Sequence, residues 1–161
     1  MNLNLKFYVV CYNNKNGLEL LKGKQKMSMG VGARARLADQ DNETVIYNYY
    51  GYNINFPDYR ADNHSYDGYI IIPKSCFVEP EIHQKIKRMP SGKKKLIIKR
   101  VPVDVDYEKM IEDGLIEVQN CSNCWKTYKN NIDYIAFHII RKIFYEYQEE
   151  GNIPNIVVYM K

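Results

Sequence analysis

The residues with the clearest potential for chemistry form a Cys-x-x-Cys motif. Cys121 and Cys124 are separated by two residues, the spacing with which a pair of thiolates on one tight turn holds a zinc ion. Zinc needs four ligands, and the sequence contains no second pair of this kind. A complete site has to recruit Cys76 and one more ligand. The candidates for that fourth ligand are His83, His64 and Cys11.

The same motif has two other interpretations. A thioredoxin-type redox motif opens a helix directly, whereas here residues 126–130 come before the next predicted helix. In the third interpretation the thiols are structural. Because the start of the chain lacks the pattern of an export signal, we expect reduced cysteines and a cytoplasmic protein. Zinc is then the one cofactor that the sequence suggests, and only weakly.

Residues suited to catalysis are scarce. The three histidines at positions 64, 83 and 138 do not form a metal-binding pair, and the usual nucleophile and phosphate-binding motifs do not occur. Asp113, Glu117 and Gln119 have the residue types of a nuclease metal site but lack its lysine. The acidic residues of the polar segment 55–67 suit a bound cation or a hydrated loop equally well. We therefore favour a protein that is not an enzyme.

Positive charge is concentrated in one segment of the chain. The net charge is only +4, but no acidic residue occurs from Ile82 to Val103, and residues 104–117 are acidic. The segment is typical of a binding site for phosphate or for an acidic protein, or the acidic block neutralises it on the folded surface. The basic residues concerned are Lys85, Lys87, Arg88, Lys93, Lys94, Lys95, Lys99 and Arg100.

Tyrosine is unusually frequent, with 15 residues against 5 phenylalanines and 1 tryptophan. Codons rich in A and T explain this bias without any function. The functional interpretation is a recognition surface, because tyrosine is enriched in protein interfaces. We expect such a surface to combine a hairpin, the polar loop and the outer face of the C-terminal helix. Its predicted residues are Tyr47, Tyr49, Tyr50, Tyr52, Tyr59, Tyr134, Phe137 and Arg141.

Hydrophobic periodicity predicts the elements that position these residues. Helical spacing predicts short helices over 79–89 and 105–113, a further short helix over 18–22, and a long amphipathic helix over 131–148. Asn130 or Asn131 is expected to cap the long helix, and Gly151 to end it. Strands are predicted over residues 3–12, 33–37, 43–53, 69–72, 96–98, 115–119 and 155–160.

This order of elements predicts an α+β fold, with a mainly antiparallel sheet, one long C-terminal amphipathic helix and two short helices. The 161 residues contain no linker or repeat, which favours a single domain over residues 1–161. No apolar run reaches the length of a membrane span.

We expect a small non-catalytic protein that binds another macromolecule. The first hypothesis is a protein–protein interaction module, such as an immunity or antitoxin-like protein or an anti-defence inhibitor in a bacterium or phage. The alternatives are a nucleic-acid-binding protein that uses residues 85–100, and a zinc-stabilised domain built on Cys76, Cys121 and Cys124. The identity of the partner and the oligomeric state stay open.

Overall fold

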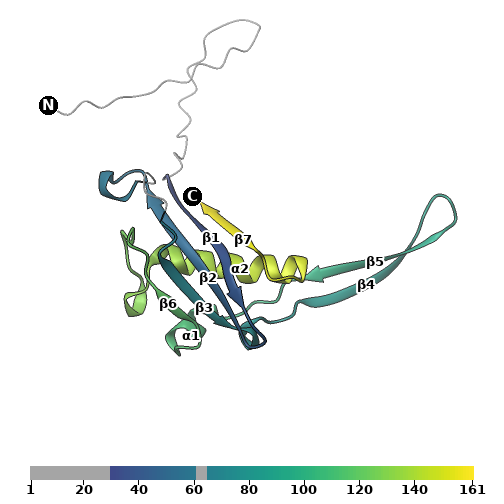
Figure 1. Cartoon of the computed structure of the whole chain (residues 1–161). Helices are drawn as coiled ribbons and strands as arrows, with labels where there is room; N and C mark the ends of the chain where they lie inside the picture. The colour runs from purple at the N-terminus through teal and green to yellow at the C-terminus, as the bar shows by residue number, and fades with distance from the viewer. Residues whose placement is uncertain (1–29, 61–64) are drawn as a thin grey trace, which may run out of the picture.

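The protein is described by a computed structural model that covers residues 30–60 and 65–161. Its main body is an antiparallel sheet of five strands in the order β6-β3-β2-β1-β7. Figure 1 shows helix α2 (Tyr134–Glu150) running across one face of this sheet. The strands are β1 (Val31–Gln40), β2 (Thr44–Asn53), β3 (Gly68–Pro73), β6 (Glu117–Gln119) and β7 (Ile156–Met160). The strand expected over 3–12 and the helix over 18–22 lie outside the described residues.

The hairpin predicted from alternating residues is confirmed as β1 and β2. Asp41 closes its turn, because the carboxylate accepts hydrogen bonds from the backbone N–H groups of Glu43 at 2.8 Å and Thr44 at 2.7 Å. Along β2, every second residue is buried. The strand therefore presents one row of side chains to the core and the other to the open face of the sheet.

The hydrophobic core lies between the sheet and α2. Ile135, Ile139 and Ile143 are fully buried and form the apolar stripe that the helical spacing predicts. A Cβ atom on Gly51 would lie 2.8 Å from Cγ2 of Ile135, so the absence of a side chain there lets the helix approach the backbone of β2.

A helix lies where the long one is predicted, but it spans Tyr134–Glu150 instead of 131–148, and its cap differs from the prediction. Asp133 is the N-cap, and its side chain accepts a hydrogen bond from the backbone N–H of Ile135 at 3.0 Å. Asn130 and Asn131 instead adopt left-handed conformations, with φ of 55° and 59°, in a 3-10 turn over Lys129–Asn131. Gly151 ends the helix with φ of 79°, as the sequence predicts.

The helix predicted over residues 79–89 is wrong, because this segment contains strand β4 (Glu81–Arg88). It pairs antiparallel with β5 (Lys94–Val101) in a separate two-stranded sheet. Residues 82 and 86 are four apart, a spacing that places them on one face of a helix and equally on one face of a strand. The described residues therefore hold two α-helices, α2 and the short α1 (Tyr107–Glu112).

Two further 3-10 turns, Pro57–Tyr59 and Lys74–Cys76, complete the regular elements of the described residues. Neither of the two α-helices is both long and apolar enough to cross a membrane. The α+β class and the antiparallel sheet are thus confirmed.

The β4–β5 ribbon, residues 81–101, projects from the body as an arm (Figure 1). The buried Gln148 of α2 fastens its base, because Nε2 donates to the carbonyl of Val78 at 3.3 Å and Oε1 accepts from the N–H of Val103 at 2.9 Å. The two ends of the arm are thereby held to the same side chain. The guanidinium of Arg100 lies against Gly151, just beyond the end of α2.

Replacing Gln148 by Leu should lower the free energy of unfolding by about 1–3 kcal/mol, because the polar backbone groups of Val78 and Val103 lose their partner. Urea denaturation measures this change. The exposed neighbour Glu150, replaced by Leu, is the matched control and should change stability by less than about 0.5 kcal/mol. Equal stability of the two variants would show that other contacts hold the base of the arm.

Candidate functional site

The Cys-x-x-Cys turn packs against a buried carboxylate. Sγ of Cys121 donates to Oδ2 of Asp133 at 3.3 Å, and the hydroxyl of Tyr49 donates to the same oxygen at 3.0 Å. Burial, together with this carboxylate, raises the pKa of the Cys121 thiol to about 12 and that of Cys124 to about 11. Both thiols are therefore protonated at neutral pH, which suits hydrogen-bond donors better than thiolate nucleophiles or ligands.

The residues proposed to complete a zinc site do not join this turn. Within residues 30–60 and 65–161, no three His, Cys, Asp or Glu side chains are arranged to hold a metal ion. Cys76 is buried, and His83 lies on the arm, 3.0 Å from the carboxylate of Glu81. His64 and Cys11 lie outside the described residues. The zinc hypothesis stays a prediction that the described residues do not support.

Two tyrosines of the predicted docking surface lie in the core. Tyr47 and Tyr49 have no exposed surface, and the hydroxyl of Tyr47 donates to the carbonyl of Pro154 at 2.6 Å. Including them in a docking surface was wrong, because this row of β2 faces α2. Tyr50 and Tyr52 belong to the other row and are half-buried on the open face of the sheet.

The aromatic side chains on the outer part of α2 are also partly covered. The ring of Tyr134 lies 5.8 Å from that of Trp125, and the ring of Phe137 lies 5.1 Å from that of Tyr128. Both partners come from the segment that precedes the helix. These ring contacts cover part of Tyr134 and of Phe137, so the two side chains do not form an open aromatic patch.

The last two residues of that predicted surface, Arg141 and Tyr59, do not belong to the β1–β2 hairpin. Arg141 is exposed, with its guanidinium 6.0 Å from the centre of the Phe137 ring. Tyr59 is half-buried beside Phe56, with ring centres 6.5 Å apart. The eight residues of the predicted docking surface therefore do not form one exposed surface.

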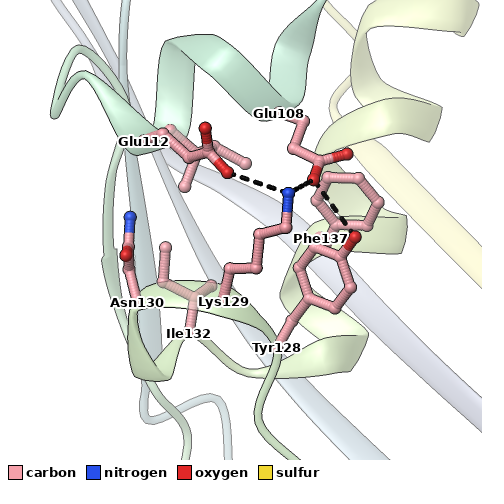
Figure 2. Close-up of a pocket in the computed structure, with 8 residues that line it drawn as sticks. Glu108, Glu112, Tyr128, Lys129, Asn130, Ile132 and Phe137 are labelled. Atoms are coloured by element: carbon pink, nitrogen blue, oxygen red, sulfur yellow. Dashed lines mark hydrogen bonds and ion pairs between the residues drawn. The ribbon is translucent and has the colours of Figure 1, made fainter.

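Figure 2 shows a depression between α1 and the turn that precedes α2. Nζ of Lys129 lies 2.6 Å from a carboxylate oxygen of Glu108 and 3.1 Å from one of Glu112. The hydroxyl of Tyr128 donates to Glu108 at 3.1 Å. The cavity beneath measures about 10 Å³, which is room for about one water molecule. These ion pairs form a structural junction and leave no space for a ligand.

A wider groove of about 380 Å³ lies on the open face of the sheet. Its walls come from β2, β3 and β6, and they include Glu117 and Gln119, two residues considered above for a metal site. The third, Asp113, ends α1. The groove is lined by Ile46, Tyr69, Ile71, Glu117, Val118 and Gln119, a set with a single carboxylate and no cation. It offers no arrangement for metal-dependent chemistry.

The side chains of the arm alternate between its two faces, and the two faces differ in composition. Directly opposite residues of an antiparallel pair lie on the same face, and the register pairs His83 with Lys99 and Lys87 with Lys95. We call this side the basic face. It consists of Glu81, His83, Lys85, Lys87, Lys95, Ile97, Lys99 and Val101. We call the other side the apolar face. Its large hydrophobic residues are Ile82, Ile86, Leu96 and Ile98, and it also carries Gln84, Arg88, Lys94 and Arg100.

The remaining predicted basic residues lie at the ends of the arm. Arg88 and Lys94 face each other next to the tip, and Lys93 belongs to the turn between the strands. Arg100 lies at the base, 3.9 Å from the carboxylate of Glu79. The structure thus brings four lysines and a histidine together on one face and assigns Arg100 to the anchoring of the arm.

The charges of the basic face are not neutralised by the acidic block that follows in sequence. Glu108 and Glu112 of that block are paired with Lys129 on the body. Lys87 and Lys95 lie directly opposite each other, and like charges in this position destabilise a strand pair. Glu81 pairs with His83 at the base of this face, and the four lysines form no ion pair within the described residues.

The amphipathic ribbon could have been recognised in the sequence. His83, Lys85 and Lys87 occupy every second position, and Ile82 and Ile86 occupy positions of the other parity, which is the period of a strand with two different faces. Comparison of the chain with family models, curated proteins and solved structures gives no match.

Stability should depend on the protonation of His138, whose ring stacks on that of Tyr159 with centres 4.6 Å apart. Burial, with Arg141 and Lys161 nearby, lowers the pKa of His138. The unfolded chain therefore binds this proton more tightly than the folded chain, and the free energy of unfolding should decrease as the pH falls below about 6.5.

Urea denaturation between about pH 5 and about pH 7 measures this dependence. The His138→Gln variant should show a smaller change over that interval, and His83→Gln controls for the loss of a histidine elsewhere. An identical pH dependence in His138→Gln and the unaltered protein would contradict the assignment.

Proposed function

We propose that the protein binds double-helical DNA through the basic face of the arm. The observation that carries this proposal is the register of β4 and β5. It places His83, Lys85, Lys87, Lys95 and Lys99 on one exposed face, whose single carboxylate, Glu81, lies at the base of the arm and pairs with His83. Lysine side chains on such a face reach phosphate oxygens, which supply most of the affinity in protein–DNA binding.

The dimensions of the arm fit the major groove of B-form DNA. Each strand has 8 residues, which gives a length of about 26 Å at about 3.3 Å per residue. A two-stranded ribbon fits a groove that is about 12 Å wide, the width of the B-DNA major groove. The major groove of an RNA duplex is too narrow for side chains to read, so the shape of the arm favours DNA.

The hypothesis of a protein-binding module, including an immunity or antitoxin-like role, stays a prediction. Its tyrosine surface is divided, since Tyr47 and Tyr49 are in the core and Tyr134 packs against Trp125. The basic face is one continuous exposed surface, and for this reason DNA binding is the better supported function.

Replacing Lys85 and Lys87 by Glu should weaken DNA binding at least about tenfold at about 0.1 M salt, because two phosphate contacts become repulsive. Fluorescence anisotropy with a labelled duplex measures the affinity. For the unaltered protein, log K should fall with log salt concentration with a slope of about −3 to −4, as expected for the four lysines.

The matched control is the replacement of Lys109 and Lys161 by Glu, which changes the net charge equally at two exposed positions of the body. This control should keep at least about half of the affinity if the arm is the binding site. Equal losses in the two variants, or no binding by the unaltered protein at low salt, would refute the proposal. Circular dichroism of both variants verifies that the body is folded.

A further inference from the structure

We propose that Cys121 and Cys124 form a reversible disulfide, so that this turn exists either as a dithiol or as a disulfide. The structure shows the dithiol, with both cysteines free. The bond joins two cysteines of the same turn, beside the buried side chain of Asp133. These residues all belong to the body, so the site does not depend on DNA binding by the arm.

The backbone of the turn places the two cysteines at the separation that a disulfide needs. The N–H of Cys124 donates to the carbonyl of Cys121 at 3.1 Å, which closes a four-residue turn. The Cα atoms at the two ends of such a turn lie less than about 7 Å apart, and disulfides usually join Cα atoms that are about 4.4–6.8 Å apart. Asn123, inside the turn, donates from Nδ2 to the carbonyl of Gly51 at 3.0 Å. The turn is therefore fixed to the sheet in a conformation that allows the bond.

Both thiols lie beside the same carboxylate. Sγ of Cys121 donates to Oδ2 of Asp133 at 3.3 Å. The thiol of Cys124 also interacts with Asp133, and its Sγ lies 3.6 Å from the carbonyl oxygen of Lys126. The other carboxylate oxygen, Oδ1, accepts from the backbone N–H of Ile135 at 3.0 Å and caps α2. The two sulfur atoms are thus held on one side of the turn, so that joining them requires side-chain rotation and no change of fold.

The two cysteines differ in exposure, and this difference sets the order of the reaction. Cys121 is only 4% exposed, whereas Cys124 is half-buried. A small-molecule disulfide, such as oxidised glutathione, therefore reaches Cys124 first. Burial, together with Asp133, raises the pKa of both thiols. Little thiolate is then present at neutral pH, and we expect exchange over minutes to hours.

The reaction consists of two thiol–disulfide exchanges. In the first, Cys124 gives up its proton, and its sulfur attacks oxidised glutathione. A mixed disulfide forms on Cys124, and one glutathione takes up a proton and leaves as a thiol. In the second, Cys121 gives up its proton, and its sulfur attacks Sγ of Cys124 and displaces the second glutathione, which also leaves as a thiol. The two cysteines together lose two electrons and two protons, and the small disulfide gains them.

Asp133 links the state of this pair to helix α2. In the dithiol its carboxylate accepts a hydrogen bond from the Cys121 thiol, and the disulfide has no S–H group to donate. Oδ2 then keeps the hydroxyl of Tyr49, 3.0 Å away, as its donor. A hydrogen bond to a charged acceptor is stronger than one to a neutral acceptor, so the carboxylate stabilises the dithiol. Oxidation therefore removes a donor from the residue that caps α2.

Incubation of the full chain in mixtures of oxidised and reduced glutathione tests the proposal, with free thiols alkylated afterwards and peptides identified by mass spectrometry. The unaltered protein should form one bond, between Cys121 and Cys124, and dithiothreitol should reverse it. The fluorescence of Trp125, the only tryptophan of the chain, should change in parallel because Trp125 follows Cys124 directly. Peptide identification distinguishes this bond from any that involves Cys11 or Cys76.

Serine variants assign the bond to this pair. Cys121→Ser should stop the reaction at the mixed disulfide on Cys124, and Cys124→Ser should remove the reaction at this turn altogether. Cys76→Ser is the matched control, because Cys76 is also a buried free cysteine but lies outside the turn. This control should form the bond like the unaltered protein.

The role of Asp133 has its own test. Asparagine also caps helices, but its neutral oxygen holds the Cys121 thiol more weakly. Asp133→Asn should therefore raise the equilibrium constant for disulfide formation about fivefold. Asp106→Asn is the matched control, because Asp106 caps a different helix, α1, through the N–H of Lys109 at 2.9 Å. It should change that constant less than about twofold. Circular dichroism verifies that both variants are folded.

Three results would overturn the inference. They are thiols that stay free in oxidised glutathione, a mixed disulfide on Cys124 that Cys121 never displaces, and bonds that form only between different chains. An unchanged equilibrium constant in Asp133→Asn would show that the carboxylate does not stabilise the dithiol. None of these measurements contains DNA, so their outcome is independent of the proposed function.

Discussion

The contact between the isoleucine stripe of α2 and the sheet is the interaction on which the rest of the structure depends. Ile135, Ile139 and Ile143 are fully buried against the sheet, so they fix where both ends of the helix lie. At the N-terminal end, Asp133 holds Tyr49 and Cys121 by hydrogen bonds. At the C-terminal end, Gln148 holds both ends of the arm. One packed helix therefore positions the cysteine turn and the arm.

This arrangement divides the molecule into a part with a core and a part without one. The body has a buried apolar core, and some of its acidic residues pair with its own cations, as Glu108 and Glu112 do with Lys129. The arm has no equivalent interior, because almost all of its residues are exposed. Its stability has to come from its base and from whatever packs against it. Its two faces differ in chemistry, since one is rich in lysine and the other in large aliphatic residues.

The sequence correctly predicts those elements whose apolar residues repeat at one spacing, either that of a strand or that of a helix, over a long segment. The β1–β2 hairpin and α2 are examples, because their apolar residues repeat at strand and helix spacing over many residues. The helix prediction for residues 79–89 failed because the spacing of Ile82 and Ile86 fits both a helix and a strand. Only the pairing of this segment with Leu96 and its neighbours shows that it is a strand. Local spacing carries no information about a partner that lies beyond a turn.

The candidate site was harder to predict because exposure is set by distant residues. Tyr47 and Tyr49 are buried since their hydroxyls find partners in Pro154 and Asp133, which are far away in sequence. Nothing near the tyrosines indicates that α2 covers this row and leaves the other open. The basic segment is visible in the composition alone, but its division between two faces requires the register of the strands.

The most direct test of the central claim is to follow backbone amide resonances of the full chain while a short DNA duplex is added. The account predicts that the largest shifts occur in β4 and β5, at Lys85, Lys87, Lys95 and Lys99, and that the resonances of the body change little. Shifts concentrated around Tyr50 and Tyr52 on the open face of the sheet, with an unchanged arm, would contradict it.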